Sequence, residues 1–259
     1  MPSGLLLVFL RQPRAGAVKT RLAAGLGGEA AAELYRALAE EEVRRTAPRG
    51  GEFGRLLCFT PSEARTEIEA WFPGEELLPQ EGPDLGARMA RAMDQAFRRG
   101  AGPVAVIGSD VPWVSRETVL EAFRALDEHD VALGPARDGG YYLLALARPE
   151  PRLFDGIAWS TPSVLSATVE RAGGLGLAVR LLEPLTDVDT IEDLEAERER
   201  LRPLLDARPA LRDVIAAALV ALRARGVDQR GKVGGRARLR QPSTVDSRQG
   251  GSTRRARRS

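Results

Sequence analysis

Histidine, cysteine and lysine are scarce in this sequence of 259 residues, which has one His, one Cys and two Lys among 38 basic residues. The lone Cys58 forms no disulfide within the chain, as expected in a reducing compartment, and its apolar run RLLCFT predicts a buried strand residue. The lone His129 argues against a Ser-His-Asp hydrolase, and one His with one Cys cannot supply a clustered His/Cys zinc site. Chemistry must therefore rest on Asp, Glu, Arg, Lys and backbone amides.

Long apolar runs are also missing. No window approaches the 18 or more apolar residues of a membrane-spanning helix, so we expect no membrane partner. The first residues, MPSGLLLVFLRQPR, lack the basic start and the small-residue cleavage site of a signal peptide. We therefore expect a cytoplasmic protein, and its 43% hydrophobic content is enough for a sizeable core.

The net charge of +2 hides two unlike parts. Residues 226–259 carry nine Arg and Lys232 against Asp228 and Asp246, with almost nothing apolar to bury, so we predict a disordered basic tail. Without aromatic residues for base stacking, this tail gives little reason to expect a nucleic-acid partner. We predict one acidic folded domain over 1–225, which ends in a helix at 209–224. The apolar face of that helix predicts docking onto the body, with a homodimer contact as the alternative.

Short β-rich runs alternate with helical patterns along the folded part. Strands are predicted at 5–10, 55–60, 103–108, 130–134, 141–147 and 177–182, and helices at 28–45, 84–99, 115–127, 162–172, 190–205 and 209–224. This alternation predicts an α/β fold with a mixed, mostly parallel sheet and helices on both faces. The link between 130–134 and 141–147 is too short for a helical crossover, so that pair is expected to be antiparallel.

Ligands of such sheets bind beyond the carboxyl ends of the strands, which directs attention to four segments. The first, RQPRAGAVKT at 11–20, leads from a strand into a helix and carries Lys19, with Arg21 next to it. The free amides of a helix start favour anions, so this segment can bind phosphate. It is not a Walker A loop, because Val18 stands where that motif needs Gly. On charge alone, a solvated loop explains it almost as well.

The next two segments add carboxylates and glycines. In VIGSDVPWVS, Asp110 follows an apolar strand, where a carboxylate can bind Mg²⁺ or form an ordinary turn, and Ser115 with Thr118 can cap the following helix. In GPARDGGYY, Asp138 precedes Gly139 and Gly140, which permit close approach of the backbone to a ligand or a plain turn.

The fourth segment, PLTDVDTIEDLEAE, places Asp187 and Asp189 two residues apart, so both point the same way in an extended chain. Thr190 and Asp193 form a capping-box pattern for the next helix. Capping needs only one acidic residue there, and the pair favours a cation site. Together the four segments combine a cationic phosphate cradle with carboxylates for Mg²⁺ or Mn²⁺, which suits transfer from a nucleotide donor to a small-molecule acceptor.

The motifs RQPRAGAVKTRLA, GPDLGARMARAM, VIGSDVP, GPARDGGYYLLAL, IAWST and DVDTIEDL follow one another over residues 4–198. In this order they resemble a family of bacterial GT-A-like transferases. Its members are labelled glycosyltransferases or radical-SAM/selenodomain-associated transferases, and the domain was formerly of unknown function. The 2-phospholactate and molybdenum-cofactor guanylyltransferases are distant relatives. The resemblance implies the Rossmann-like nucleotide-diphospho-sugar transferase (GT-A) fold.

The resemblance also implies roles for individual residues. Lys19 and Arg21 would contact the donor phosphates, and Asp110 would bind the metal with Asp189 or Asp187. The cleft for nucleotide and acceptor would be lined by Asp84, Gly86, Asp138, Gly139, Gly140, Ser160 and Thr161. Two departures stand out: IAWST (157–161) replaces the acceptor segment of the guanylyltransferases, which argues against carrying over their substrate, and Arg14-Ala15 replaces a Gly-rich turn.

Three functions are compatible with these features. The leading one is a Mg²⁺-dependent glycosyltransferase that uses a nucleoside-diphosphate sugar. The alternative is a nucleotidyltransferase of the 2-phospholactate guanylyltransferase type, which releases pyrophosphate. The third is a nucleotide-binding protein without catalysis. The first two reactions need the same loops, so their products, nucleoside diphosphate or pyrophosphate, must separate them.

Overall fold

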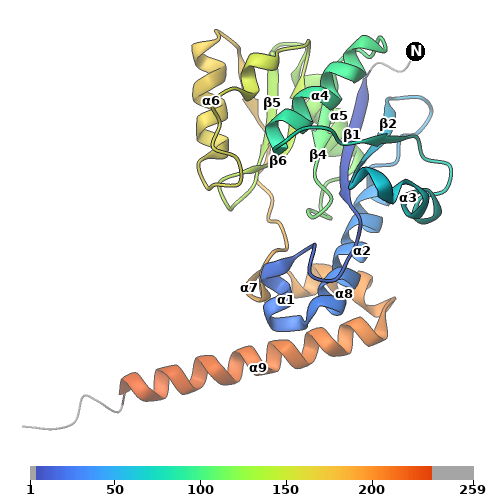
Figure 1. Cartoon of the computed structure of the whole chain (residues 1–259). Coiled ribbons are helices and arrows are strands. Elements are labelled where there is room, and N and C mark those ends of the chain that lie inside the picture. The colour runs from blue at the N-terminus through green and yellow to red at the C-terminus, as the bar shows by residue number, and fades with distance from the viewer. Residues whose placement is uncertain (1–3, 235–259) are drawn as a thin grey trace, which may run out of the picture. The chain divides into compact units, whose positions relative to one another are not determined.

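The computed structural model describes residues 4–234, in which seven strands form one sheet (Figure 1). The order across the sheet is β3-β2-β1-β4-β6-β5-β7. The strand bounds are β1 Leu5–Arg11, β2 Gly54–Thr60, β3 Leu77–Pro79, β4 Val104–Ile107, β5 Val131–Pro135, β6 Tyr141–Leu146 and β7 Val179–Leu181. All neighbours pair in parallel except β6, which is antiparallel to both β4 and β5. The mixed, mostly parallel sheet and its local antiparallel pair are confirmed.

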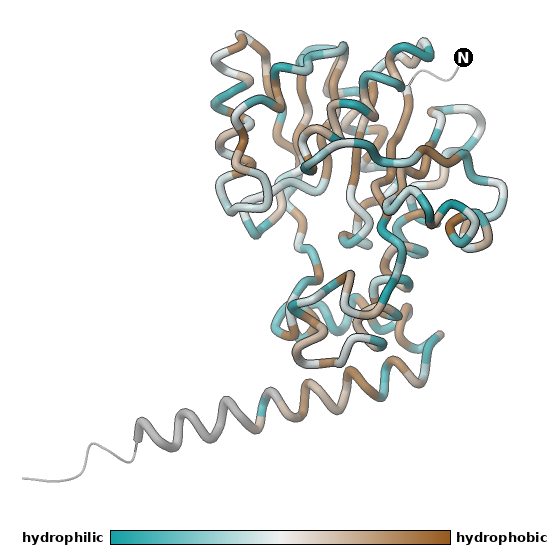
Figure 2. The backbone as a smooth tube through the Cα atoms, viewed as in Figure 1, coloured by the Kyte–Doolittle hydropathy of each residue, from teal (hydrophilic) through white to brown (hydrophobic). Residues whose placement is uncertain are grey.

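Both faces of the sheet are covered. In β1, Leu6, Val8 and Leu10 face one apolar cluster, and Leu7 and Phe9 face another. This alternation within an unbroken apolar run is expected for a strand buried on two sides. In Figure 2 the strands of the sheet are largely brown, the colour of apolar residues.

The helices build the two outer layers. The first face packs against α2 (Gly28–Arg45), α3 (Arg65–Trp71) and α5 (Arg116–Ala125), and the second against α4 (Leu85–Arg98), the 3₁₀ turn η2 (Pro151–Phe154) and α6 (Val164–Gly174). A short 3₁₀ turn, η1 (Ser62–Ala64), precedes α3.

A third apolar cluster is built mainly by helices, with Val188 and Trp113 from the segments before α7 (Ile191–Ala196) and α5. It joins α1 (Thr20–Leu26) and α2 to α7, α8 (Arg198–Asp206) and the beginning of α9 (Pro209–Gly234). Leu211, Ile215 and Leu219 of α9 are buried in it. The predicted docking of this helix onto the body is confirmed up to Leu219.

Some elements differ from the sequence prediction. The helix predicted at 190–205 is two helices, α7 and α8, which meet at Glu197. The elements α1, α3 and β3 were not predicted, because each is only three to seven residues long and too short for a clear periodic pattern. The last helix continues beyond 224 to Gly234.

The chain divides into two units, Met1–Leu219 and Val220–Ser259. Of the second unit the structure describes the end of α9, and the rest of the predicted basic tail, from 235 on, lies outside the described residues, as do the first three residues. The boundary at 225 and the disorder of the tail therefore stay predictions. Within residues 4–234, no helix combines the length and the apolar character needed to cross a membrane.

Candidate active site

The site lies where the sheet changes direction. After β1 the chain builds β2 and β3 on one side and then returns to place β4 on the other side of β1. Ligands of open α/β sheets bind at the carboxyl ends of the strands at such a switch point. The segment after β1 carries Lys19, and the segment after β4 carries Asp110. The fold therefore brings together two residues that are 91 positions apart in the sequence.

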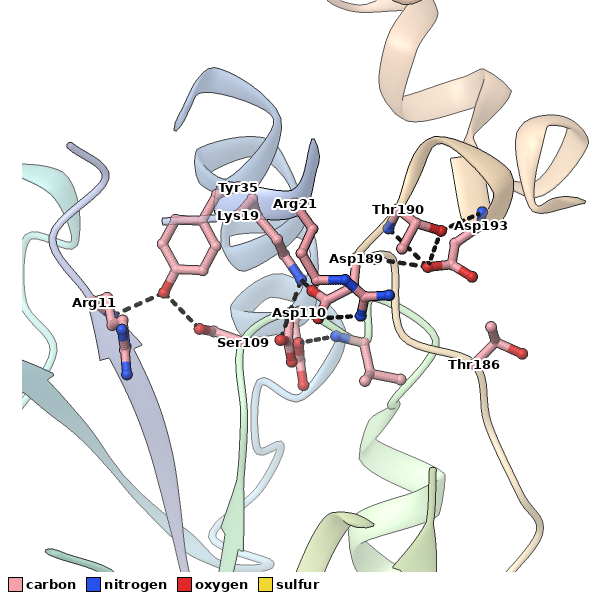
Figure 3. Close-up of polar contacts among 12 residues, drawn as sticks. Arg11, Lys19, Arg21, Tyr35, Ser109, Asp110, Thr186, Asp189, Thr190 and Asp193 are labelled. Atoms are coloured by element: carbon pink, nitrogen blue, oxygen red, sulfur yellow. Dashed lines mark hydrogen bonds and ion pairs between the residues drawn. The ribbon is translucent and has the colours of Figure 1, made fainter. Parts of the chain in front are cut away.

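The Lys19 ammonium joins the two segments (Figure 3). Its Nζ lies 3.2 Å from Oδ2 of Asp110 and 2.5 Å from Oδ1 of Asp189, while the Arg21 guanidinium lies 4.0 Å from Asp189. Only 4% of the Lys19 side chain is exposed, against 41% for Asp110 and 33% for Asp189. Burial lowers the pKa of Lys19, but the two carboxylates outweigh it and raise the pKa, so the amine stays charged.

The backbone of Lys19 is in the left-handed region, with φ 47° and ψ 46°, at the start of α1. For a residue with a Cβ, this backbone conformation costs about 1–2 kcal/mol of conformational free energy. The Lys19 carbonyl accepts a hydrogen bond from the Ala23 amide, and Val18 beside it is buried. The fold thus keeps an unfavourable backbone conformation at the residue whose side chain binds both carboxylates.

The segment with Asp187 and Asp189 is fixed from two sides. The Leu185 amide donates to Pro135 at the end of β5, and the Val188 amide donates to the carbonyl of Asp110. The indole of Trp113 donates to the carbonyl of Thr186, and the Arg200 guanidinium covers its ring at 3.8 Å. Thr190 and Asp193 form the predicted capping box, in which Asp193 also accepts from the Asp189 amide.

Two buried side chains of α2 support the site, and neither was predicted from the sequence. The Tyr35 hydroxyl accepts from the Arg11 amide at 2.8 Å and lies 2.7 Å from Ser109 Oγ, so it ties the end of β1 to the end of β4. Burial raises the pKa of Tyr35 to about 12, which keeps the hydroxyl protonated.

Glu42 is the second of these side chains and is fully buried. Its Oε2 accepts from the Val111 amide at 3.2 Å, while Oε1 has no hydrogen-bond partner. Burial, followed by the charge of Asp110, raises the pKa of Glu42 well above its ordinary value. The helical spacing of Tyr35, Leu38 and Glu42 on one buried face is the sequence signal that could have revealed it.

One cavity of about 950 Å³ opens beside these groups. We call Lys19, Arg21, Asp110, Asp187 and Asp189 its charged wall. We call Leu85, Met89, Tyr141, Trp159 and Val164 its apolar wall. Arg11 and Arg88 also line the cavity. The Arg88 guanidinium donates to the Gly82 carbonyl, and among the described residues neither arginine forms an ion pair with a carboxylate. A cavity of this size, with an apolar wall and convergent charged groups, is typical of a small-molecule site.

The apolar wall depends on two close contacts. A Cβ at Gly86 of α4 would overlap the indole of Trp159. Gly139, with φ +93°, lies so close to Pro162 that a Cβ would overlap its carbonyl oxygen. Between these contacts Ser160 has φ 63°, in the left-handed region. The segment 157–162 therefore packs closely against α4 on one side and against the β5–β6 turn on the other.

The structure brings most of the predicted site residues into this cavity. The lining includes Lys19, Arg21, Asp84, Asp110, Asp138, Gly140, Ser160, Thr161, Asp187 and Asp189. Asp84 also caps α4 by accepting from the Ala87 amide, and Asp138 accepts from the Gly140 amide. Gly86 and Gly139 lie behind the lining, where they permit packing. Whether these residues bind substrate stays a prediction.

The carboxylates of the site fit a divalent cation in part. Asp110 and Asp189 already direct one oxygen each at a single positive charge, the Lys19 ammonium. Burial and the charges of Asp189, Asp138 and Asp110 raise the pKa of Asp187 to about 6. No group of three or more His, Cys, Asp or Glu side chains in the described part is arranged to bind a metal by itself. Mg²⁺ commonly takes one or two carboxylates and completes its shell with substrate phosphates and water.

Residues 26–161 match the family described as "Uncharacterized protein conserved in bacteria (DUF2064)". The phosphoenolpyruvate guanylyltransferase of Chloroflexus aggregans is 31% identical over 186 residues, which are 70% of this chain and 89% of that protein. The enzyme of the same name from Sphaerobacter thermophilus is 30% identical over 189 residues, which are 70% of this chain and 87% of its own length.

Solved structures agree on the fold. A proposed nucleotide-diphospho-sugar transferase from Desulfovibrio desulfuricans G20 is 33% identical, with a TM-score of 0.76 over 84% of this chain and 99% of its own. CMP:2-keto-3-deoxy-manno-octonic acid synthetase with CTP is 14% identical, with a TM-score of 0.51 over 78% and 99%.

The relatives include both kinds of transferase that the sequence left open, so the transferase class is confirmed. The chain belongs to the DUF2064 family and is a transferase with the nucleotide-diphospho-sugar transferase fold.

Proposed function

We propose that this protein is a nucleotidyltransferase that joins a nucleoside triphosphate to a small phosphorylated acid. In this reaction a phosphate oxygen of the acceptor attacks the α-phosphorus of the donor. The bond from that phosphorus to the oxygen bridging to the β-phosphate breaks, and pyrophosphate leaves. Because the two curated relatives are phosphoenolpyruvate guanylyltransferases, GTP and phosphoenolpyruvate are the first pair to test.

The observation that carries this proposal is the placement of cationic side chains around one cavity. Arg11, Lys19, Arg21 and Arg88 all line it. A triphosphate and a phosphorylated carboxylic acid are both strongly anionic, so they require positive charge at two places. A neutral acceptor such as a sugar would need far less. Five aspartates line the same cavity, and Lys19 and Arg21 pair with two of them, but Arg11 and Arg88 form no ion pair among the described residues. These two guanidinium groups favour an anionic acceptor beside an anionic donor.

Each wall has a task in this mechanism. Lys19 and Arg21 would bind the β- and γ-phosphates and stabilise the charge that develops on the leaving pyrophosphate. Asp110, with Asp189 or Asp187, would bind Mg²⁺ or Mn²⁺, which neutralises the donor phosphates and polarises the α-phosphorus. Arg88, on α4 beside the apolar wall, is placed to orient the anionic acceptor, and Arg11 lies at the end of β1 near the charged wall.

The test is product analysis with purified protein. With GTP, phosphoenolpyruvate and Mg²⁺ we expect pyrophosphate, detected by ³¹P NMR and by a pyrophosphatase-coupled assay, and none without the acceptor. Other nucleoside triphosphates and other phosphorylated acids form the comparison panel. If no triphosphate yields pyrophosphate with any acceptor of the panel, the proposal is wrong.

Glycosyl transfer is the second candidate, because the 33% identical solved structure is described as a proposed nucleotide-diphospho-sugar transferase. The same product analysis tests this candidate. With a panel of nucleoside-diphosphate sugars as donors, glycosyl transfer would release nucleoside diphosphate in place of pyrophosphate. Release of a diphosphate that depends on Asp110 would favour this candidate.

A further inference from the structure

Lys19 lies where a cation shared by two carboxylates is expected. Its ammonium is within 3.2 Å of Asp110 and within 2.5 Å of Asp189, which come from segments after β4 and before α7. The Lys19 side chain is almost fully covered, whereas both carboxylates are partly exposed toward the cavity. The two acidic groups thus share one buried positive charge that belongs to the protein itself.

We propose that the Lys19 ammonium is a placeholder for the divalent cation, which makes metal and nucleotide bind as a pair. In the substrate-free protein it occupies the place between Asp110 and Asp189. It turns to the donor phosphates only when the metal arrives with the nucleotide. This inference rests on the proposed function, because it assumes a nucleotide bound through metal and phosphates.

Competition between two cations gives the physical reason. Mg²⁺ binds carboxylate oxygens at about 2.0–2.1 Å, so it cannot share the space between Asp110 and Asp189 with the ammonium that contacts both. A metal that entered alone would leave the charge of Lys19 buried without partners, which is strongly unfavourable. A polyphosphate removes this penalty, because its oxygens give the ammonium new anionic partners.

The fixed backbone of Lys19 makes the exchange a side-chain movement. Val18 is buried, and the Lys19 carbonyl is bonded to the Ala23 amide in the first turn of α1. The Cα therefore stays in place while the flexible four-carbon side chain swings. The Arg21 side chain is 68% exposed, and its guanidinium lies 4.0 Å from the Asp189 carboxylate. It lies next to this path and can bind the same phosphates.

The first experiment measures binding of Mn²⁺ alone, without nucleotide, by the loss of the free Mn²⁺ signal in electron paramagnetic resonance. Lys19→Met removes the competing ammonium at nearly constant volume. We expect it to bind Mn²⁺ about 10-fold more tightly than the wild type, within the 5–150-fold range of coupled sites. Arg14→Met, an exposed charge in the same segment, should bind as the wild type does. The same or weaker Mn²⁺ binding by Lys19→Met would overturn the proposal.

The second experiment needs no change at Lys19 and remains decisive if Lys19→Met does not fold. The chain has two lysines, so ¹⁵N-lysine labelling of the Lys232→Arg variant leaves one ammonium signal, that of Lys19. We expect this signal to shift at saturation with Mg²⁺ and GTP and to stay in place with the same Mg²⁺ concentration alone. An unchanged signal in the saturated complex contradicts the exchange.

The two proposals fail in different ways. If no nucleotide binds or reacts, the proposed function is wrong, yet the Mn²⁺ comparison still decides whether Lys19 competes with a metal. If pyrophosphate is formed but Lys19→Met shows no gain in Mn²⁺ affinity, the function stands and the placeholder role is wrong.

Discussion

The charged wall and the apolar wall of the cavity are built by different forces. Ion pairs join Lys19 to Asp110 and Asp189, so the charged wall depends on charges that attract each other across segments distant in sequence. The apolar wall depends on contact: Trp159 lies on Gly86, and Pro162 lies on Gly139. Loss of a charge should therefore change chemistry more than folding, and added volume should change folding more than chemistry.

The strongest test of this contrast is Asp110→Asn. We expect the rate of transfer to fall about 10²–10³-fold, because the variant loses the charge that pairs with Lys19 and that would bind the proposed metal, while the shape is kept. The measurement is pyrophosphate release under saturating substrates. Asp94→Asn, at an exposed ion pair with Arg98 on α4, is the matched control and should retain full activity. A loss of activity equal in both variants would contradict the assignment of the charged wall.

This contrast also explains what could be predicted from the sequence. The sequence was enough to predict the charged residues of the site, because each lies in a segment that follows a strand and can be recognised from that segment alone. These residues are Lys19, Asp110, Asp187 and Asp189. The sheet then had only to bring those ends together, and β1 and β4 are neighbours at its switch point. The mixed sheet followed from a link between β5 and β6 too short for a crossover.

The apolar wall and the supports behind the site were not predictable in the same way. Gly86 and Gly139 were expected to contact the ligand, yet each makes room for a side chain or carbonyl that only the tertiary structure brings near. Glu42 belongs to an acidic stretch whose sequence predicts a solvent-exposed helix face. It is buried because α2 directs this position toward the loop after β4, where it accepts from the Val111 amide. Such contacts depend on packing between distant elements, which no local pattern encodes.

Gly139→Ala tests the apolar wall. The new Cβ would meet the Pro162 carbonyl at a backbone φ of +93°, so strain and overlap add. We expect the free energy of unfolding to fall by about 2–4 kcal/mol, measured by urea unfolding. Gly16→Ala is the matched control, because Gly16 has φ +79° with nothing within 4 Å, and it should lose only about 1 kcal/mol. Equal losses would show that the contact with Pro162 is unimportant.

A buried carboxyl behind the charged wall predicts a dependence of stability on pH. Since burial raises the pKa of Glu42 in the folded state, the fold retains a proton that the unfolded chain releases above about pH 4.3. The free energy of unfolding should therefore decrease as pH rises from that value toward the folded pKa. Glu42→Gln cannot titrate and keeps an acceptor for the Val111 amide, so its stability relative to the wild type should improve from pH 5 to pH 8.

Urea unfolding in the presence of EDTA at both pH values measures this difference without bound metal. Glu41→Gln provides the control, since Glu41 pairs with Arg44 at the surface of the same helix. Its stability should keep a constant difference from that of the wild type. Parallel pH profiles for the wild type and Glu42→Gln would show that Glu42 is ionised in both states.

The smallest effect is expected at the capping box of α7, and it separates stability from positioning. Thr190 Oγ1 donates to Asp193 at 2.8 Å and accepts from the Asp193 amide at 3.2 Å, while Asp193 also accepts from the Asp189 amide. Thr190→Ala should cost about 1 kcal/mol, as the loss of an N-cap does, and should raise the KM of the donor because Asp189 is held less firmly.

Ser115→Ala removes the corresponding box of α5, which has no side chain in the lining of the cavity, and should cost about the same stability with unchanged KM. Thermal unfolding and initial-rate kinetics on both variants decide the point. If both change KM alike, or neither does, the cap of α7 serves only the helix. If Thr190→Ala alone changes it, the short hydrogen-bonded turn before α7 is part of the machinery that places the charged wall.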